Sequence, residues 1–138
     1  MCIRDRFGKP WKIGIKHPRR KGKALAIVRL TNTCLVTSGD YEKFFELNGK
    51  RYHHIIDPRT GYPARGCMSA SVVAPNAEYA DALATSLCVL GPAKGMKLIE
   101  LLPKVEAVLV GMNGEVHVSS GLQGQVPAGS VDNDDTSQ

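Results

Sequence analysis

The stretch MSASVVAPNAEYADALATSLCVLGP, residues 68–92, decides the fold class because its pattern of apolar residues changes part-way along. Residues 68–74 are small or apolar and are bounded by Pro75, which is typical of a short strand. Asn76 suits a helix N-cap, and the Ala- and Leu-rich residues 77–90 end at Gly91, a residue favoured where a helix stops. We therefore expect a strand followed directly by a helix.

Turn signals and apolar spacing predict the elements on either side of this stretch. A second helix is expected over residues 92–102, because Pro92 suits a first helical turn and Pro103 lies just past the end. Asn48-Gly49 is a strong two-residue hairpin signal. Strands are expected at residues 11–16, 24–30, 34–37, 41–47, 51–56, 105–111 and 115–118. The expected fold class is α+β, a mostly antiparallel sheet with a late pair of helices.

Charge is distributed unevenly along the 138 residues, which carry a net charge of +5. Residues 1–51 hold 13 Lys or Arg and 4 Asp or Glu, and the basic excess is densest in KHPRRKGK, residues 16–23. Such a run can bind nucleic acid. Its Pro and Gly, and the absence of interleaved aromatic residues, favour a solvated turn instead, so no nucleic-acid partner is expected. No apolar run approaches the ~20 residues of a membrane-spanning helix.

The two ends of the chain differ from its middle. The opening residues MCIRD match the translation of a transposon-end adapter used in library preparation, so residues 1–6 are expected to be a sequencing artefact. From Gln123 the sequence is polar and acidic without periodicity, which predicts a disordered tail over residues 123–138. Residues 7–122 are the expected folded domain. The four cysteines show no C-x-x-C pair, so neither a zinc site nor a disulfide framework is indicated.

Asp81 and Thr85 stand four residues apart on the first expected helix, so their side chains share one face. A carboxylate and a hydroxyl are hard oxygen ligands of the kind that suit Mg²⁺. Leu83, Leu87 and Leu90 mark another, buried face. By itself the Asp81/Thr85 spacing is common on ordinary helix surfaces, and both interpretations remain open at this point.

Two adjacent histidines precede a turn, DPRTG, at residues 57–61. Side chains alternate along a strand, so only one of His53 and His54 faces a given site. Histidine is the usual general base near neutral pH. The same residues also fit a tight turn with incidental histidines, because Asp, Pro and Gly are all favoured in turns.

Three motifs together are more specific than each alone: SGDYE at residues 38–42, HIIDPRTG at 54–61 and ADALAT at 80–85. In this order and spacing, and with KPWKIGI at 9–15, they resemble the ApbE family of FAD:protein FMN transferases. The resemblance covers about residues 9–121 and implies a partial, T-fold-like ApbE-type domain. It also implies that residues 7–122 are the C-terminal portion of a longer domain whose N-terminal half is missing.

The resemblance implies an enzyme that binds FAD and Mg²⁺ and moves the FMN half onto a Thr or Ser hydroxyl of a target flavoprotein, releasing AMP. Asp81 and Thr85 match the family's metal ligands. His54 matches the histidine proposed to take the hydroxyl proton, and Ile56 matches a residue whose main chain contacts the flavin. Asp57 is expected to shape the turn and to hold His54.

The missing half carries most of the flavin pocket in the family and often an export or lipoprotein signal. The resemblance therefore implies a periplasmic protein, or one at the outer face of a bacterial inner membrane, and a 138-residue chain that binds FAD poorly. Some relatives carry an acid just before the metal-binding Thr, where this chain has Ala84. Two alternatives remain: a Mg²⁺-dependent FAD pyrophosphatase giving FMN and AMP, and a non-catalytic flavin-binding protein.

Overall fold

A computed structural model describes residues 8–127 and 129–130, and it confirms the expected α+β class. The elements, in chain order, are β1 (Trp11–Lys16), β2 (Ala24–Leu30), β3 (Cys34–Gly39), β4 (Phe44–Leu47), β5 (Lys50–His53), β6 (Cys67–Ala74), α1 (Ala77–Leu90), α2 (Pro92–Leu101), β7 (Glu106–Gly111), β8 (Glu115–Val118), the short 3₁₀ helix η1 (Ser120–Leu122) and β9 (Gly129–Ser130). Each predicted strand and helix is present, and the differences lie at the ends.

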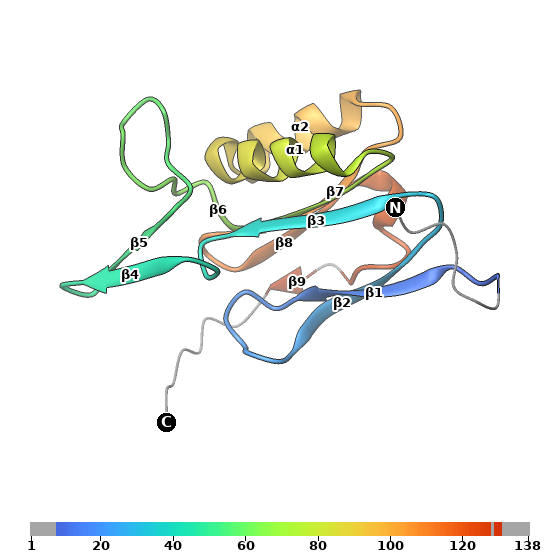
Figure 1. The fold of residues 1–138 in the computed structure, drawn as a ribbon, viewed down its shortest axis with the longest axis horizontal. Helices are drawn as coiled ribbons and strands as arrows, with labels where there is room; N and C mark the ends of the chain where they lie inside the picture. Colours follow the sequence, from blue (N-terminus) through green and yellow to red (C-terminus); the bar gives the residue numbers. More distant parts are fainter. Residues whose placement is uncertain (1–7, 128, 131–138) are drawn as a thin grey trace.

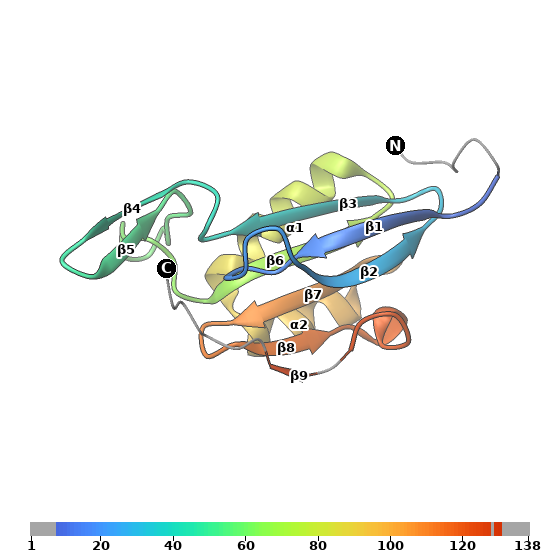
Figure 2. The same ribbon diagram turned by 90° about the horizontal axis from the view of Figure 1, so that it is seen from below.

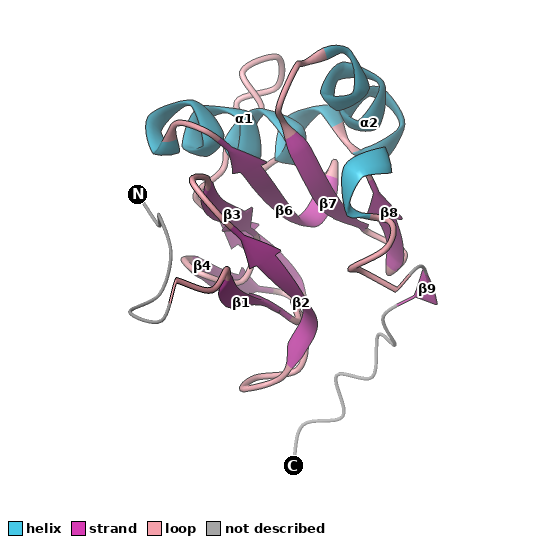
Figure 3. Ribbon diagram, turned by 90° about the vertical axis from the view of Figure 1, so that its right-hand side faces the viewer, coloured by secondary structure: helices cyan, strands magenta, loops and turns pink. Residues whose placement is uncertain are grey.

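A five-stranded antiparallel sheet in the order β3-β6-β7-β8-β9 forms the centre of the molecule. Both helices cover one of its faces (Figures 1 and 3). The core on that side joins side chains of α1 and α2 to alternate residues of β6 and β7: Ala70, Val72, Ala74, Ala80, Leu83, Ala84, Leu87, Cys88, Ile99, Ala107 and Leu109. The apolar stripe of α1 is therefore the feature that attaches the helical layer to the sheet.

The hairpin of β1 and β2 lies against the opposite face of the sheet, as Figures 2 and 3 show. A second core fills this side and includes Ile15, Val28 and Leu30 of the hairpin together with Val73 and Val108 of the sheet. Every residue of β6 is buried because its two faces are covered by different layers. This explains why the β6 sequence is small and apolar throughout and does not alternate with polar residues.

The β4–β5 hairpin forms a separate two-stranded sheet that projects from one end of the molecule (Figures 1 and 2). Its turn is the predicted Asn48-Gly49 pair, and both residues have positive φ, at 51° and 71°. Two positive φ values are what a type I′ hairpin turn requires. All four residues of β4 are exposed, so packing against the body contributes little to this hairpin.

The ends of α1 show one success and one error of sequence reasoning. The side chain of Asn76 accepts a hydrogen bond from the backbone amide of Tyr79, as the N-cap prediction required. Leu90, however, is 38% exposed, so the expectation that it is buried with Leu83 and Leu87 is wrong. At this end of the helix it is Cys88 and Gly91 that pack inward, because the backbone of Gly66 lies directly against them.

Order extends past the predicted start of the C-terminal tail. Val126 is 2% exposed, and the side-chain oxygen of Gln125 accepts a hydrogen bond from the backbone amide of Arg29 at 2.7 Å. The predicted start of the tail at residue 123 is therefore too early, because an isolated buried valine gives no periodic signal.

The structure does not describe residues 1–7, 128 and 131–138. The predicted adapter stretch and most of the predicted tail therefore lie outside the described residues. Within the described ranges, no helix is long and apolar enough to cross a membrane.

Replacing Gly66 by Ala should destabilise the fold. A Cβ at Gly66 would lie 2.3 Å from the carbonyl oxygen of Cys88 and 2.7 Å from the amide nitrogen of Gly91, and neither backbone atom can rotate away. We expect a loss of about 1–3 kcal/mol in the free energy of unfolding, measured by urea titration followed by circular dichroism. Gly124→Ala is the matched control, because a Cβ there meets nothing within 4 Å. Equal stability of the two variants would contradict the contact.

Candidate functional site

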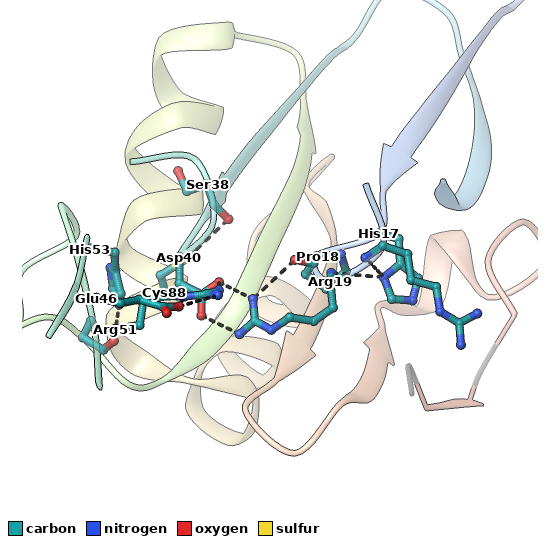
Figure 4. A network of polar contacts seen from close by, with 11 residues as sticks. His17, Pro18, Arg19, Ser38, Asp40, Glu46, Arg51, His53 and Cys88 are labelled. Atoms are coloured by element: carbon teal, nitrogen blue, oxygen red, sulfur yellow. Dashed lines mark hydrogen bonds and ion pairs between the residues drawn. The ribbon is translucent and has the colours of Figure 1, made fainter. Parts of the chain in front are cut away.

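The SGDYE motif lies where β3 leaves the central sheet, and its Asp40 is 3% exposed. A carboxylate buried to this degree requires a cation. The guanidinium of Arg19 binds both carboxylate oxygens at 2.7 Å, in the two-bond geometry that suits this pair, and Arg51 lies 3.8 Å from one of them (Figure 4). Asp40 therefore joins the turn after β1, the end of β3 and strand β5.

The basic turn at residues 16–23 is therefore only partly solvated, because its Arg19 binds the buried Asp40. The side chain of Arg19 is only 13% exposed, and His17 accepts hydrogen bonds through Nδ1 from the backbone amides of Arg19 and Arg20. The sequence analysis did not predict the ion pair between Asp40 and Arg19. The available signal was an acidic residue directly after a buried strand, which needs a partner from elsewhere in the chain.

The SGDYE motif also contacts the helix that carries Asp81 and Thr85. The hydroxyl oxygens of Ser38 and Thr85 are 3.3 Å apart, and the thiol of Cys88 donates to the carbonyl oxygen of Ser38 at 3.6 Å. Asp81 and Thr85 are exposed on α1, whereas Ala84 between them is fully buried. The first and third motifs of the sequence therefore meet in space.

The donor set at Asp81 and Thr85 fits Mg²⁺ and does not fit a metal that is enclosed by protein ligands. Both donors are oxygens on a solvent-facing helix surface, and Mg²⁺ keeps several waters and shares phosphate oxygens. Among the described residues, no group of three or more His, Cys, Asp or Glu side chains is arranged to hold a metal. The assignment of these two residues as metal ligands stays a prediction.

His53 and His54 have different surroundings. His53 accepts a hydrogen bond from the amide of Ile55 at Nδ1 (3.3 Å) and lies 2.8 Å from the carbonyl oxygen of Ala64 through Nε2. It therefore fastens the loop at residues 54–66 to the hairpin. His54 is exposed, and its Nδ1 lies 3.3 Å from the carbonyl oxygen of Lys43. Because a carbonyl only accepts, this contact needs the proton on Nδ1, which leaves Nε2 with a free lone pair.

Asp57 shapes the DPRTG turn as expected. Its side chain accepts from the backbone amide of Arg59 at 2.9 Å, and its carbonyl oxygen accepts from the amides of Thr60 and Gly61. The carboxylate binds the guanidinium of Arg59 at 2.7 Å rather than the ring of His54, so the expected Asp57–His54 pairing is wrong. The Arg59 side chain, and then its amide, lower the pKa of Asp57. Arg59, two residues further along the same turn, is the partner of Asp57 that the sequence analysis did not predict.

Within the described residues, no hydrogen bond joins His54 to Asp81 or Thr85. The link between their motifs is indirect. It passes from Thr85 to Ser38, along the chain to Asp40, and across the ion pair to Arg51 in the strand that precedes His54. The site is therefore a set of three neighbouring segments rather than a directly bonded cluster.

The sequence model of the ApbE family matches residues 2–109, which includes all three of these segments. The chain belongs to the ApbE family. Among curated ApbE-family relatives, the FAD:protein FMN transferase of Treponema pallidum is 44% identical over 118 residues, 84% of this chain and 33% of that protein. The FAD:protein FMN transferase of Haemophilus influenzae is 45% identical over 96 residues, 67% of this chain and 28% of that protein. The chain thus spans about a third of the length of these relatives.

Solved ApbE structures agree with the fold described above. The ApbE protein of Thermotoga maritima superposes with a TM-score of 0.79 at 37% identity, and the match covers 88% of this chain and 40% of that one. The Pseudomonas stutzeri flavinyl transferase ApbE, in its apo form, gives a TM-score of 0.67 at 34% identity over 89% of this chain and 39% of that one. The partial ApbE-type domain expected from the sequence is confirmed.

Exchanging either histidine for alanine should separate their roles. His53→Ala removes two hydrogen bonds that fix the loop and is expected to lower the free energy of unfolding by about 1–2 kcal/mol. His54→Ala, at an exposed position, should change it by no more than about 0.5 kcal/mol. Urea denaturation of both variants checks this, and equal losses would refute the assignment of His53 as the structural histidine.

The DPRTG turn should show a pH signature. Because the pKa of Asp57 is lowered in the folded state, its contribution to stability is present above the ordinary carboxyl pKa and is lost as pH falls through the folded value. Titration of the carboxyl carbons by NMR should show Asp57 ionising below the usual range. In Arg59→Gln its pKa should rise toward that range without reaching it, because the backbone amide remains. An unchanged pKa in this variant would exclude Arg59 as the cause.

Proposed function

We propose that the protein to which this chain belongs transfers the FMN half of FAD to a Thr or Ser hydroxyl of a target flavoprotein and releases AMP. The observation that carries this proposal is the contact between the first and third motifs, together with the ion pair that links the first motif to the strand before His54. Thr85 of the helix contacts Ser38, and Asp40, two residues further on, lies 3.8 Å from Arg51 in β5, the strand that ends directly before His54. Membership of the ApbE family, and relatives that are FAD:protein FMN transferases, support the same reaction.

His54 is the proposed general base. Its Nδ1 contact with the carbonyl oxygen of Lys43 favours the tautomer whose exposed Nε2 can accept a proton. The hydroxyl oxygen of the acceptor would bond to the phosphorus of the FMN half while the bond from that phosphorus to the AMP oxygen breaks. The hydroxyl proton passes to His54, and AMP leaves with the electron pair of the broken bond. A base in this position contributes about 10²–10⁴-fold to a rate.

Asp81 and Thr85 would hold the Mg²⁺ ion. A bound Mg²⁺ stabilises the negative charge that develops on the bridging and leaving oxygens of a diphosphate. The hydroxyl of Thr85 is oriented by Ser38, and the carboxylate of Asp81 has no ion-pair partner in the described part of the chain, so it is available to a cation. The exposed Ile56 would present its main chain to the flavin, beside the bridge that it forms with Pro63.

A chimera tests this assignment with the residues of this chain. The 118-residue segment that aligns with the Treponema pallidum transferase would replace its counterpart in that protein, and the chimera would receive FAD, Mg²⁺ and an acceptor flavoprotein of that transferase. We expect AMP release and flavin covalently attached to the acceptor. His54→Ala should slow transfer by about 10²–10⁴-fold, and Asp81→Ala should lower it by at least about 100-fold and raise the Mg²⁺ concentration required.

Asn113→Ala, in the β7–β8 turn away from the three motifs, is the matched control and should transfer at the rate of the parent chimera. Full transfer by Asp81→Ala in a chimera whose circular dichroism is unchanged would remove the metal assignment. AMP release at the same rate with and without acceptor, and no attached flavin, would instead identify an FAD pyrophosphatase.

A further inference from the structure

A cleft of about 670 Å³ lies between the basic turn and the base of the β4–β5 hairpin. Its volume is in the range of pockets that hold small organic ligands. It is distinct from the exposed pair Asp81 and Thr85, neither of which lines it. Its walls include Lys16, Arg19, Lys21, Lys23, Phe44 and Arg51.

The wall of this cleft carries six Lys or Arg side chains and one carboxylate, that of Glu42. Glu42 is already paired with Lys16 at 3.1 Å, and Arg19 is bound to the buried Asp40. In the part of the chain that the structure describes, the ammonium groups of Lys21 and Lys23 have no ion-pair partner. The cleft therefore has a positive excess that attracts an anion.

Tyr41 also lines the cleft, but its hydroxyl lies below the cleft surface. Its phenol oxygen is shielded from solvent and has no hydrogen-bond partner among the described residues, which is costly for a buried polar group. Burial, and then the nearby carboxylates of Glu42 and Asp40, raise the pKa of Tyr41 to about 12. The phenol is therefore neutral at physiological pH and adds no charge to the cleft.

The cleft also has an aromatic side. Phe44 lines it and carries the guanidinium of Arg51 over its ring, 4.2 Å from the centroid. An aromatic ring and a planar guanidinium offer flat surfaces on which a heterocycle can stack. Cations beside a flat apolar surface are the combination that recognises a phosphate attached to an aromatic ring system.

We propose that this cleft binds the phosphate monoester of a nucleotide, with the phosphate at Lys21 and Lys23 and the ring against Phe44. The identity of the nucleotide rests on the proposed function, under which both AMP and FMN are phosphate monoesters that arise from FAD. The cleft is then a second nucleotide site, separate from the proposed metal site and suited to retaining a product or to holding one half of a dinucleotide.

Calorimetric titration of the purified 138-residue chain tests this proposal in EDTA at low salt. AMP or FMN should bind about tenfold more tightly than adenosine or riboflavin, and the affinity should fall as salt is added. Tighter binding of AMP identifies the adenylate as the natural ligand, and tighter binding of FMN identifies the flavin. Lys21→Gln/Lys23→Gln should weaken binding about tenfold, whereas Lys94→Gln/Lys97→Gln, on the exposed surface of α2, should not.

Asp81→Ala/Thr85→Ala should bind as the parent chain does; loss of binding there would assign the ligand to the metal site and overturn the proposal. Equal binding of AMP and adenosine, unchanged affinity in Lys21→Gln/Lys23→Gln, or no binding of either nucleotide to the folded chain would also overturn it. Because no transfer is measured, these outcomes are independent of the chimera assay.

Discussion

The buried carboxylate of Asp40 is the constraint on which the arrangement of this chain depends. The described strands form one five-stranded and two separate two-stranded sheets, so no backbone ladder fixes the hairpins relative to the centre. Asp40 follows β3 of the central sheet, Arg19 belongs to the turn after β1, and Arg51 is in β5. One carboxylate that needs cations thereby orients three sheets, and removing one partner of such a buried pair costs more than the pair contributes.

Sequence reasoning succeeded where the cause of a structure is local. The Asn76 cap, the Asn48-Gly49 turn and the apolar stripe of α1 each depend on residues within a few positions, and all three are present. It failed where the partner is distant, as for Arg19 and Asp40, which are 21 residues apart and were interpreted separately. Single buried residues such as Val126 also give no signal, because burial depends on what the rest of the chain brings over them.

The candidate site shows the same division. Spacing alone identified Asp81 and Thr85 as a possible pair. Strand alternation indicated that only one of the two adjacent histidines faces a site, and the family resemblance selected His54; the structure shows that the two have different surroundings. The contact between Ser38 and Thr85 was not foreseeable, because it depends on α1 packing across the end of β3. The chain spans about a third of the length of these curated relatives, and the roles of these groups in catalysis stay proposals.

The exposed strand β4 has a consequence for handling the molecule. Among the described strands only β5 pairs with it, so one row of its backbone amides and carbonyls is open, and its side chains include the exposed Phe44, Phe45 and Leu47. An open, apolar strand edge is a template on which another copy can add its own strand. We therefore expect concentrated solutions of the isolated chain to self-associate through this edge, and a charged or proline substitution at Leu47 to reduce that association.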